Sequence, residues 1–169
     1  MIIIKKFTTR RITATAMTAA VYTALTVLLP IPAYGEIQLR LSEALNLLAF
    51  INPAFAPGII LGVFTANLFS PINPLFDTIF GTLHTATAML FITKFSKNLF
   101  IASLWPTVFS FYISGMIFYV SGIPWSLQGF LIITATIMAG QFIAVTVIGY
   151  PLFTRLMRNK KILEILKNI

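Results

Sequence analysis

The chain alternates long apolar stretches with short polar breaks. The first apolar run extends from Ile12 to Leu29, follows a cluster of basic residues and is closed by two prolines. The later runs are separated by segments rich in Pro, Gly, Asn and Ser, the residues that end helices and form turns. We therefore predict six helices, at residues 12–29, 37–51, 57–69, 77–93, 99–120 and 126–153.

Some of these helices depart from a plain membrane span. Segments 37–51 and 57–69 are shorter than the roughly 20 residues that a span requires, so they are either short helices or a re-entrant hairpin. Both choices leave the surrounding topology unchanged. Pro106 predicts a kink in segment 99–120, and the last helix is long enough to tilt. The tail that begins at Arg155 is basic and amphipathic.

Composition identifies the solvent of these helices. Of the 169 residues, 58% are hydrophobic and 9% are charged, whereas soluble domains have about 25% charged residues. The mean hydropathy is +0.93. A chain this short has too little interior to hide so much apolar surface from water. We therefore predict an all-α integral membrane bundle of six helices that forms one domain over residues 1–169.

The charges indicate how the bundle is oriented. With six crossings and a cytoplasmic N-terminus, every basic residue except Arg40 falls on the cytoplasmic side, as the positive-inside rule requires. Both termini are then cytoplasmic. The net charge of +8 is explained by topology and by contact with anionic membrane lipid, and nucleic acid is not an expected partner.

Several kinds of chemistry are excluded. The sequence has no cysteine, one histidine and four carboxylates, which is too few for most metal clusters. It has no phosphate-binding loop, nucleophile elbow or HExxH motif. We therefore expect neither a cofactor nor an enzyme. Uptake by such a chain would draw its energy from partners or from an ion gradient.

Three carboxylates and one arginine lie in or beside the apolar segments, towards the outer side. Glu36, Arg40 and Glu43 are spaced by four and three residues, which stacks them on one face if a helix begins near Tyr34. Asp77 is the third acid. Ionisable groups at membrane depth usually face a cavity or one another. The cluster is either a structural salt bridge or a binding site for a cationic or donor-rich solute.

Other polar residues are weaker candidates. Asn67 and Gln141 could bind a ligand, but hydrogen bonding between helices is the default role for each. His84 could relay protons, although packing against a neighbouring threonine is the simpler reading. Tyr34 and Trp125 fall at the predicted outer interface, where aromatic residues anchor helices or stack on a planar ligand.

The first helix carries Ala16, Ala20 and Ala24 at four-residue spacing. Such a stripe of small residues lets another helix approach closely. Spacing alone leaves open whether that helix belongs to this chain's own bundle or to a partner.

Two blocks of sequence are similar to a known family. The block from Tyr34 to Leu45, YGEIQLRLSEAL, and the segments GVFTANLFS (62–70) and DTIFGTL (77–83) resemble the QueT family. Members of this family are the integral membrane substrate-binding (S) components of energy-coupling factor (ECF) transporters. The length, the six-helix layout and the cytoplasmic termini also agree, whereas the part after Phe100 carries no matching motif.

The resemblance implies a function, a location and partners. An S component in the plasma membrane of a bacterium captures a trace nutrient from outside, and an ECF T subunit with two ATPase subunits drives its transport. The implied substrate is a queuosine precursor, a 7-deazaguanine such as the 7-aminomethyl form. The alanine stripe would dock on the T subunit, and the whole bundle would reorient to release the substrate inside.

The resemblance also gives roles to the candidate site residues. Glu43 or Glu36 would read the guanine edge, and Asp77 or the other glutamate would hold the aminomethyl cation. The full implied site contains Tyr34, Glu36, Arg40, Glu43, Asn67 and Asp77. Three alternatives remain: an S component for another vitamin or nucleobase, a stand-alone proton-coupled carrier that uses His84 and Asp77, and a scaffold without a ligand.

Overall fold

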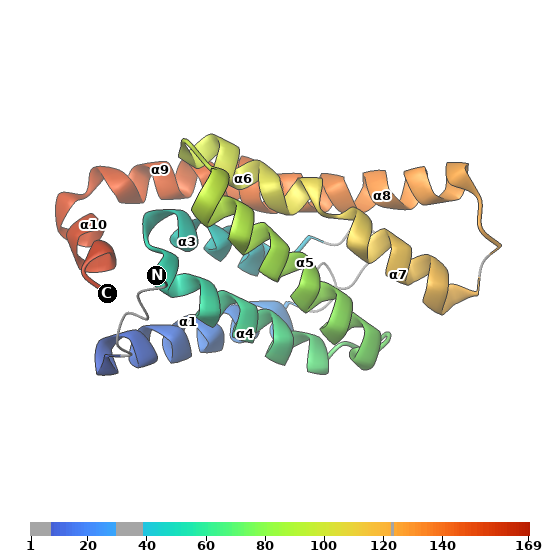
Figure 1. Cartoon of the computed structure of the whole chain (residues 1–169), viewed down its shortest axis with the longest axis horizontal. Coiled ribbons are helices and arrows are strands. Elements are labelled where there is room, and N and C mark those ends of the chain that lie inside the picture. Colours follow the sequence, from blue (N-terminus) through green and yellow to red (C-terminus); the bar gives the residue numbers. More distant parts are fainter. Residues whose placement is uncertain (1–7, 30–38, 123) are drawn as a thin grey trace, which may run out of the picture.

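A computed structural model describes residues 8–29, 39–122 and 124–169, and all regular structure in these ranges is helical. The chain folds into an elongated bundle (Figure 1). Its first half contains α1 (Thr9–Val27), the 3₁₀ segment η1 (Leu41–Leu47), α3 (Leu48–Ile51), η2 (Pro53–Phe55) and α4 (Ala56–Leu68). Its second half contains α5 (Pro74–Phe95), α6 (Leu99–Val108), α7 (Phe111–Ser121), α8 (Leu127–Gln141), the π-helical segment η3 (Phe142–Gly149), α9 (Tyr150–Arg158) and α10 (Lys160–Lys167).

Three helical stretches of the described chain are long and apolar enough to cross a membrane. They are Pro74–Phe95, Leu99–Ser121 and Leu127–Arg158. The stretches Leu41–Ile51 and Pro53–Leu68 are apolar but shorter, as their sequences predict. The expected span at residues 12–29 is a helix, yet it is not among the three, because α1 includes two arginines and several threonines that lower its hydropathy.

The predicted count of six helices is not met in full. Each predicted segment contains a helix in its described part, with some ends that are not helical, and the basic tail forms a seventh helical stretch, α10. Asn159 separates it from α9, because its side-chain Oδ1 accepts hydrogen bonds from the backbone N–H groups of Lys161 and Ile162. A side chain that caps the first N–H groups starts a new helix. The orientation of the termini stays a prediction.

Polar caps set other helix boundaries. Asn73 and Asn98 accept hydrogen bonds from backbone N–H groups in the first turns of α5 and α6. Ser126 does the same for α8. Because Asn73 is the cap, α5 begins at Pro74, three residues before the predicted start at 77.

Two prolines interrupt the α-helical winding. The predicted kink at Pro106 is confirmed as a break, because α6 ends at Val108 and α7 begins at Phe111. Pro151 lacks an N–H group, and the preceding residues wind as the π-helix η3, in which the N–H of Tyr150 donates to the carbonyl of Val145. The stretch Leu127–Arg158 nevertheless stays continuous.

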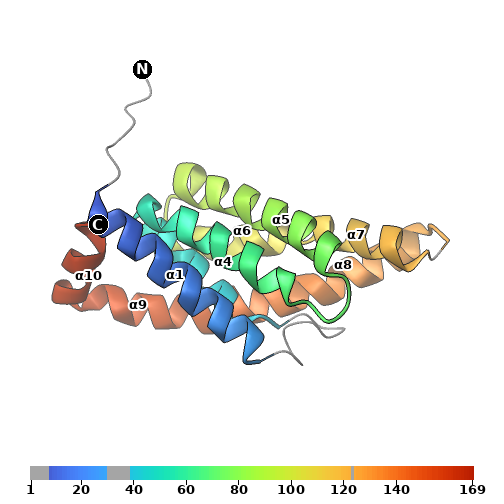
Figure 2. The same ribbon diagram turned by 90° about the horizontal axis from the view of Figure 1, so that it is seen from below.

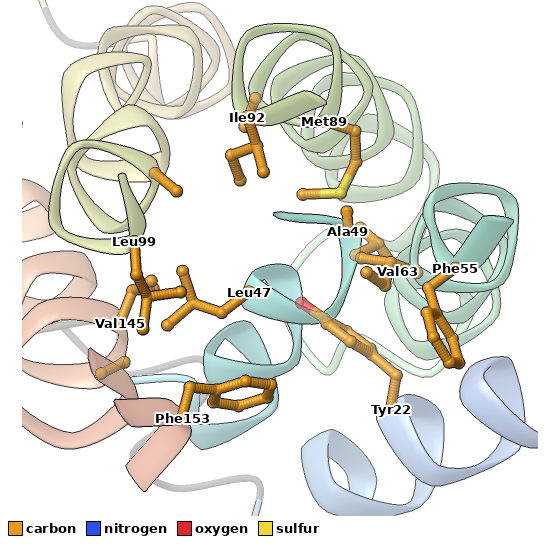
Figure 3. Close-up of a cluster of buried hydrophobic side chains, with 14 of the residues drawn as sticks. Tyr22, Leu47, Ala49, Phe55, Val63, Met89, Ile92, Leu99, Val145 and Phe153 are labelled. Atoms are coloured by element: carbon orange, nitrogen blue, oxygen red, sulfur yellow. The ribbon is translucent and has the colours of Figure 1, made fainter. Parts of the chain in front are cut away.

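The core is a cluster of buried side chains between the two halves of the bundle (Figure 3). Tyr22 of α1 reaches into it, together with Leu47, Met89 and Val145 from three other elements. On this buried face, α1 also packs against α4 at two glycines, Gly58 and Gly62. A Cβ added at Gly62 would lie 2.6 Å from the Cβ of Tyr22, so this close packing depends on the absence of a side chain.

We expect Gly62→Ala to lower the free energy of unfolding by roughly 2 kcal/mol, because overpacking a close helix contact forces the backbones apart. Gly115→Ala is the matched control, because a Cβ at Gly115 meets nothing within 4 Å. Thermal unfolding of the two variants in the same detergent checks this. Equal melting temperatures would contradict the close α1–α4 contact.

Candidate functional site

The candidate site centres on a row of polar side chains along η1. A 3₁₀-helix has three residues per turn, so Arg40, Glu43 and Asn46 lie one above another. The N–H of Glu43 donates to the carbonyl oxygen of Arg40 at 3.0 Å. The exposed fractions of the three residues are 6%, 1% and 0%. The row is therefore buried inside the bundle.

The observed geometry of this row differs from the predicted α-helical stack. The helix expected over residues 37–51 begins only at Leu41, and Arg40 before it has extended backbone with φ −95° and ψ 101°. The first seven helical residues are 3₁₀ rather than α. Three-residue spacing consequently aligns Arg40 with Glu43 and Asn46. The predicted α-helical stack on Glu36 involves a residue that lies outside the described part of the chain, as does Tyr34.

Glu43 is held by two donors. The hydroxyl of Tyr22 donates to Oε1 at 2.7 Å, and Nδ2 of Asn46 donates to Oε2 at 2.6 Å. Tyr22 is fully buried and comes from α1 (Figure 3). Each carboxylate oxygen has two lone pairs. Both oxygens of Glu43 can therefore accept another hydrogen bond while the protein fixes their direction.

The charges of Arg40 and Glu43 also act on His84, a buried residue of α5. Both Arg40 and Glu43 act electrostatically on the side chains of Tyr22 and His84. Nε2 of His84 lies 2.8 Å from the carbonyl oxygen of Pro106. This hydrogen bond joins α5 to α6 near the proline break. The hydrogen-bond partner of His84 is therefore a backbone carbonyl, and the expected packing against a neighbouring threonine stays a prediction.

A second polar group lies where α4 meets α5, at the end of the bundle away from α10 (Figure 1). Nδ2 of Asn67 donates to the backbone carbonyl of Asp77 at 2.9 Å, and the hydroxyl of Ser70 donates to Oδ2 of Asp77. The N–H of Ser70 donates to the carbonyl of Asn67 at 3.0 Å. The structure thus brings Asn67 and Asp77 together across the connection between the two helices.

Several buried polar atoms lack a hydrogen-bond partner within the described part of the chain. Five of them come from five different elements: Asn46 Oδ1, Asn67 Oδ1, Thr85 Oγ1, Thr107 Oγ1 and Gln141 Oε1. An unpaired buried polar atom costs about 1–3 kcal/mol, so native proteins keep few of them without a reason. Their presence inside the bundle favours an interior that binds a hydrogen-bonding ligand.

The sequence did not identify Tyr22 as a site residue, whereas the expected interfacial position of Trp125 agrees with its exposure. Tyr22 was treated only as part of an apolar helix, although a buried tyrosine hydroxyl needs a partner and Tyr22 lies among alanines and threonines. Trp125 is 65% exposed and contacts the rings of Phe118 and Phe130. Its position at the surface agrees with the default anchoring role.

The alanine stripe faces away from this interior. Ala16, Ala20 and Ala24 are exposed, whereas the neighbouring Ala19 and Tyr22 on the other face of α1 are buried. The three alanines line a groove of about 670 Å³, whose other wall consists of α4 residues. The stripe is therefore not covered by the described part of this chain's own bundle.

The described residues contain no group of three or more His, Cys, Asp or Glu side chains able to hold a metal ion. The buried polar side chains identified above are amides, hydroxyls, the imidazole of His84, the carboxylates of Glu43 and Asp77, and Arg40. This arrangement suits recognition of an organic molecule through hydrogen bonds.

Comparison with known proteins gives one result. The model of a family described as QueT transporter matches residues 12–158, which is most of the chain. No curated protein and no solved structure gives a significant match.

Proposed function

Because the chain belongs to the QueT transporter family, we propose that it is the membrane-embedded substrate-binding component of an ECF importer for a queuosine precursor. The match to a transporter family and the three long apolar helices make it a membrane protein of transport. The observation that carries the proposal is the buried Glu43, which is oriented by two donors in an interior rich in unpaired polar atoms.

The chemistry of the proposed substrate fits this interior. A 7-deazaguanine presents adjacent N–H donors on its guanine edge, and a carboxylate accepts such a pair through both oxygens. Glu43 would read this edge. The unpaired Asn46 Oδ1 lies on the same 3₁₀ row and offers an additional acceptor. A 7-aminomethyl group is a cation, for which Asp77 or Glu36 would supply the opposite charge, while Tyr34 would stack on the ring.

The proposed partners supply the energy that this chain lacks. In this proposal, an ECF T subunit docks on the exposed face of Ala16, Ala20 and Ala24, and two ATPase subunits drive the reorientation of the bundle. The chain itself would need no cofactor and would catalyse no reaction. Its place would be the plasma membrane of a bacterium, with several crossings and both ends in the cytoplasm.

Thermal stabilisation of the detergent-purified protein tests the proposed ligand class. A ligand that binds only the native state stabilises it by about 2.7 kcal/mol at a hundredfold excess over its Kd. We expect a clear rise in Tm with 7-aminomethyl-7-deazaguanine and no rise with common vitamins. A rise with a vitamin alone would keep the transport role and replace the substrate. The absence of a rise with every compound would contradict a ligand-binding role.

A further inference from the structure

At one end of the bundle, α10 folds back against the start of α1 (Figure 2). A second groove lies at this end. It has a volume of about 530 Å³, which is within the range of ligand pockets, about 300–1,000 Å³. One wall is α1, the opposite wall is α10, and residues of η1, α3 and η2 complete the lining. None of the candidate site residues that the structure describes lines it.

The α1 residues that line the groove change from polar to apolar along the helix. Arg10 and Thr13 line it near the start of the helix, and Met17 and Val21 line it further along. Met17 is 62% exposed and Val21 is 48% exposed. An α-helix rises 1.5 Å per residue, so the basic mouth and the apolar end are about 16 Å apart. One end therefore suits a polar group and the rest suits a hydrocarbon chain.

Basic residues outnumber acidic residues around the mouth of the groove. The first turn of α1 contains no acidic residue but contains Arg10 and Arg11, although the N-terminus of a helix already carries a partial positive charge. Arg10 is exposed. On the facing α10, exposed Lys160, Lys161 and Lys167 outnumber the one exposed acid, Glu164, although none of the four lines the groove itself. An anion at this end would offset the repulsion among these charges.

The two walls are fixed to the rest of the bundle by hydrogen bonds. Nδ2 of Asn52 donates to the carbonyl oxygens of Leu166 and Lys167 at 3.0 and 3.3 Å, which caps the end of α10. Nε of Arg11 donates to the carbonyl oxygen of Ile169 at 3.1 Å. These bonds hold α10 beside α1. The groove is consequently a defined part of the fold.

We infer that this groove binds one anionic phospholipid, with its phosphate at Arg10 and an acyl chain along Met17 and Val21. The order of basic mouth and apolar end matches the order of head and tail in a phospholipid. A partner's apolar helix would fill the apolar part, but it would leave the positive mouth without a counter-charge. The inference is independent of which solute the interior binds.

Native mass spectrometry of the full chain tests the inference, with phosphatidylglycerol and phosphatidylcholine of identical acyl chains as probes. We expect phosphatidylglycerol to be retained more strongly. Arg10→Gln should weaken its binding about fivefold, which is roughly 1 kcal/mol for one basic residue near an anionic head group. Lys97→Gln is the matched control, because Lys97 is exposed between α5 and α6, outside the lining of the groove. Phosphatidylglycerol binding by this variant should change less than twofold.

Two further experiments distinguish contacts with the lipid head group from contacts with its acyl chain. Ala14 lines the groove, so Ala14→Phe should reduce retention of phosphatidylglycerol, while an unchanged Tm shows that the variant is folded. Glycerol phosphate, which has no acyl chain, should not compete. Equal losses in Arg10→Gln and Lys97→Gln, or full retention in folded Ala14→Phe, would overturn the inference in favour of unspecific charge attraction or of another occupant.

Discussion

Glu43→Gln should weaken binding of 7-aminomethyl-7-deazaguanine by roughly four orders of magnitude, because a site built to hydrogen-bond its ligand discriminates at about this level. The variant keeps the shape of the side chain but replaces one acceptor oxygen with an NH₂ group. That group would face either the hydroxyl of Tyr22 or the amide of Asn46, both of which donate to the carboxylate in the parent. The hydroxyl of Tyr22 or the amide of Asn46 must then reorient to accept from that group, and the pair of acceptor oxygens is lost.

Isothermal titration with the detergent-purified variant measures this loss, and its Tm without ligand shows whether it is folded. Tyr22→Phe is the control, because it removes one donor and leaves the carboxylate in place. Its loss of affinity should be much smaller. If Glu43→Gln binds as tightly as the parent, Glu43 does not read the guanine edge.

The same titration with two ligands assigns the second acid. Asp77→Asn should weaken binding of the 7-aminomethyl ligand and leave unsubstituted 7-deazaguanine unaffected if Asp77 holds the cation. Equal effects on both ligands would instead indicate that Asp77 acts through its contacts with Ser70 and Asn67 at the α4–α5 connection. The cation would then be assigned to Glu36.

Ala20→Leu is expected to reduce ATP-driven uptake roughly tenfold or more while ligand affinity stays within twofold. The physical reason is that small residues allow two helices to approach closely, and a leucine side chain keeps them apart. Ala20 is exposed on the face of α1 opposite the buried Tyr22. The substitution therefore leaves the interior intact. Uptake of labelled ligand into proteoliposomes that contain the whole importer is the measurement.

Ala135→Leu provides the control for this experiment. Ala135 is also an exposed alanine of a helix, but it lies on α8, away from α1 and α4. Uptake should remain near the parental rate. Normal uptake in Ala20→Leu would show that the stripe does not contact the T subunit. Loss of ligand binding in this variant would show that the alanines support the fold of the interior.

The helical segments were predictable because apolar runs and breaks by Pro, Gly and Asn leave a clear pattern in the sequence. The proline break after α6 and the shortness of segments 37–51 and 57–69 followed from the same pattern. The cost of an ionisable group at membrane depth led to the expectation that the charged residues face a cavity or one another, but it did not give the depth of Glu43. These predictions depend on local sequence and on the solvent around the helices.

The geometry of the site was not predictable in the same way. Periodicity predicted an α-helix through Arg40, whereas η1 winds as a 3₁₀-helix whose buried Ser42 shares a hydrogen bond of 2.6 Å with Thr26 of α1. The role of Tyr22 depends on a contact with a residue 21 positions away. Such pairings arise from packing between helices, and a single sequence does not reveal them.

The hydrogen bond that holds the end of the chain after α10 beside α1 has a consequence for biosynthesis. The hydrogen bond from Arg11 to Ile169 joins residues 158 positions apart, and α10 leaves the ribosome after every other described helix. Closing so long a loop is entropically costly and slow compared with local helix formation. The end of the molecule that carries the groove between α1 and α10 is therefore assembled last. A nascent chain that has inserted all its apolar helices still lacks the α10 wall of that groove.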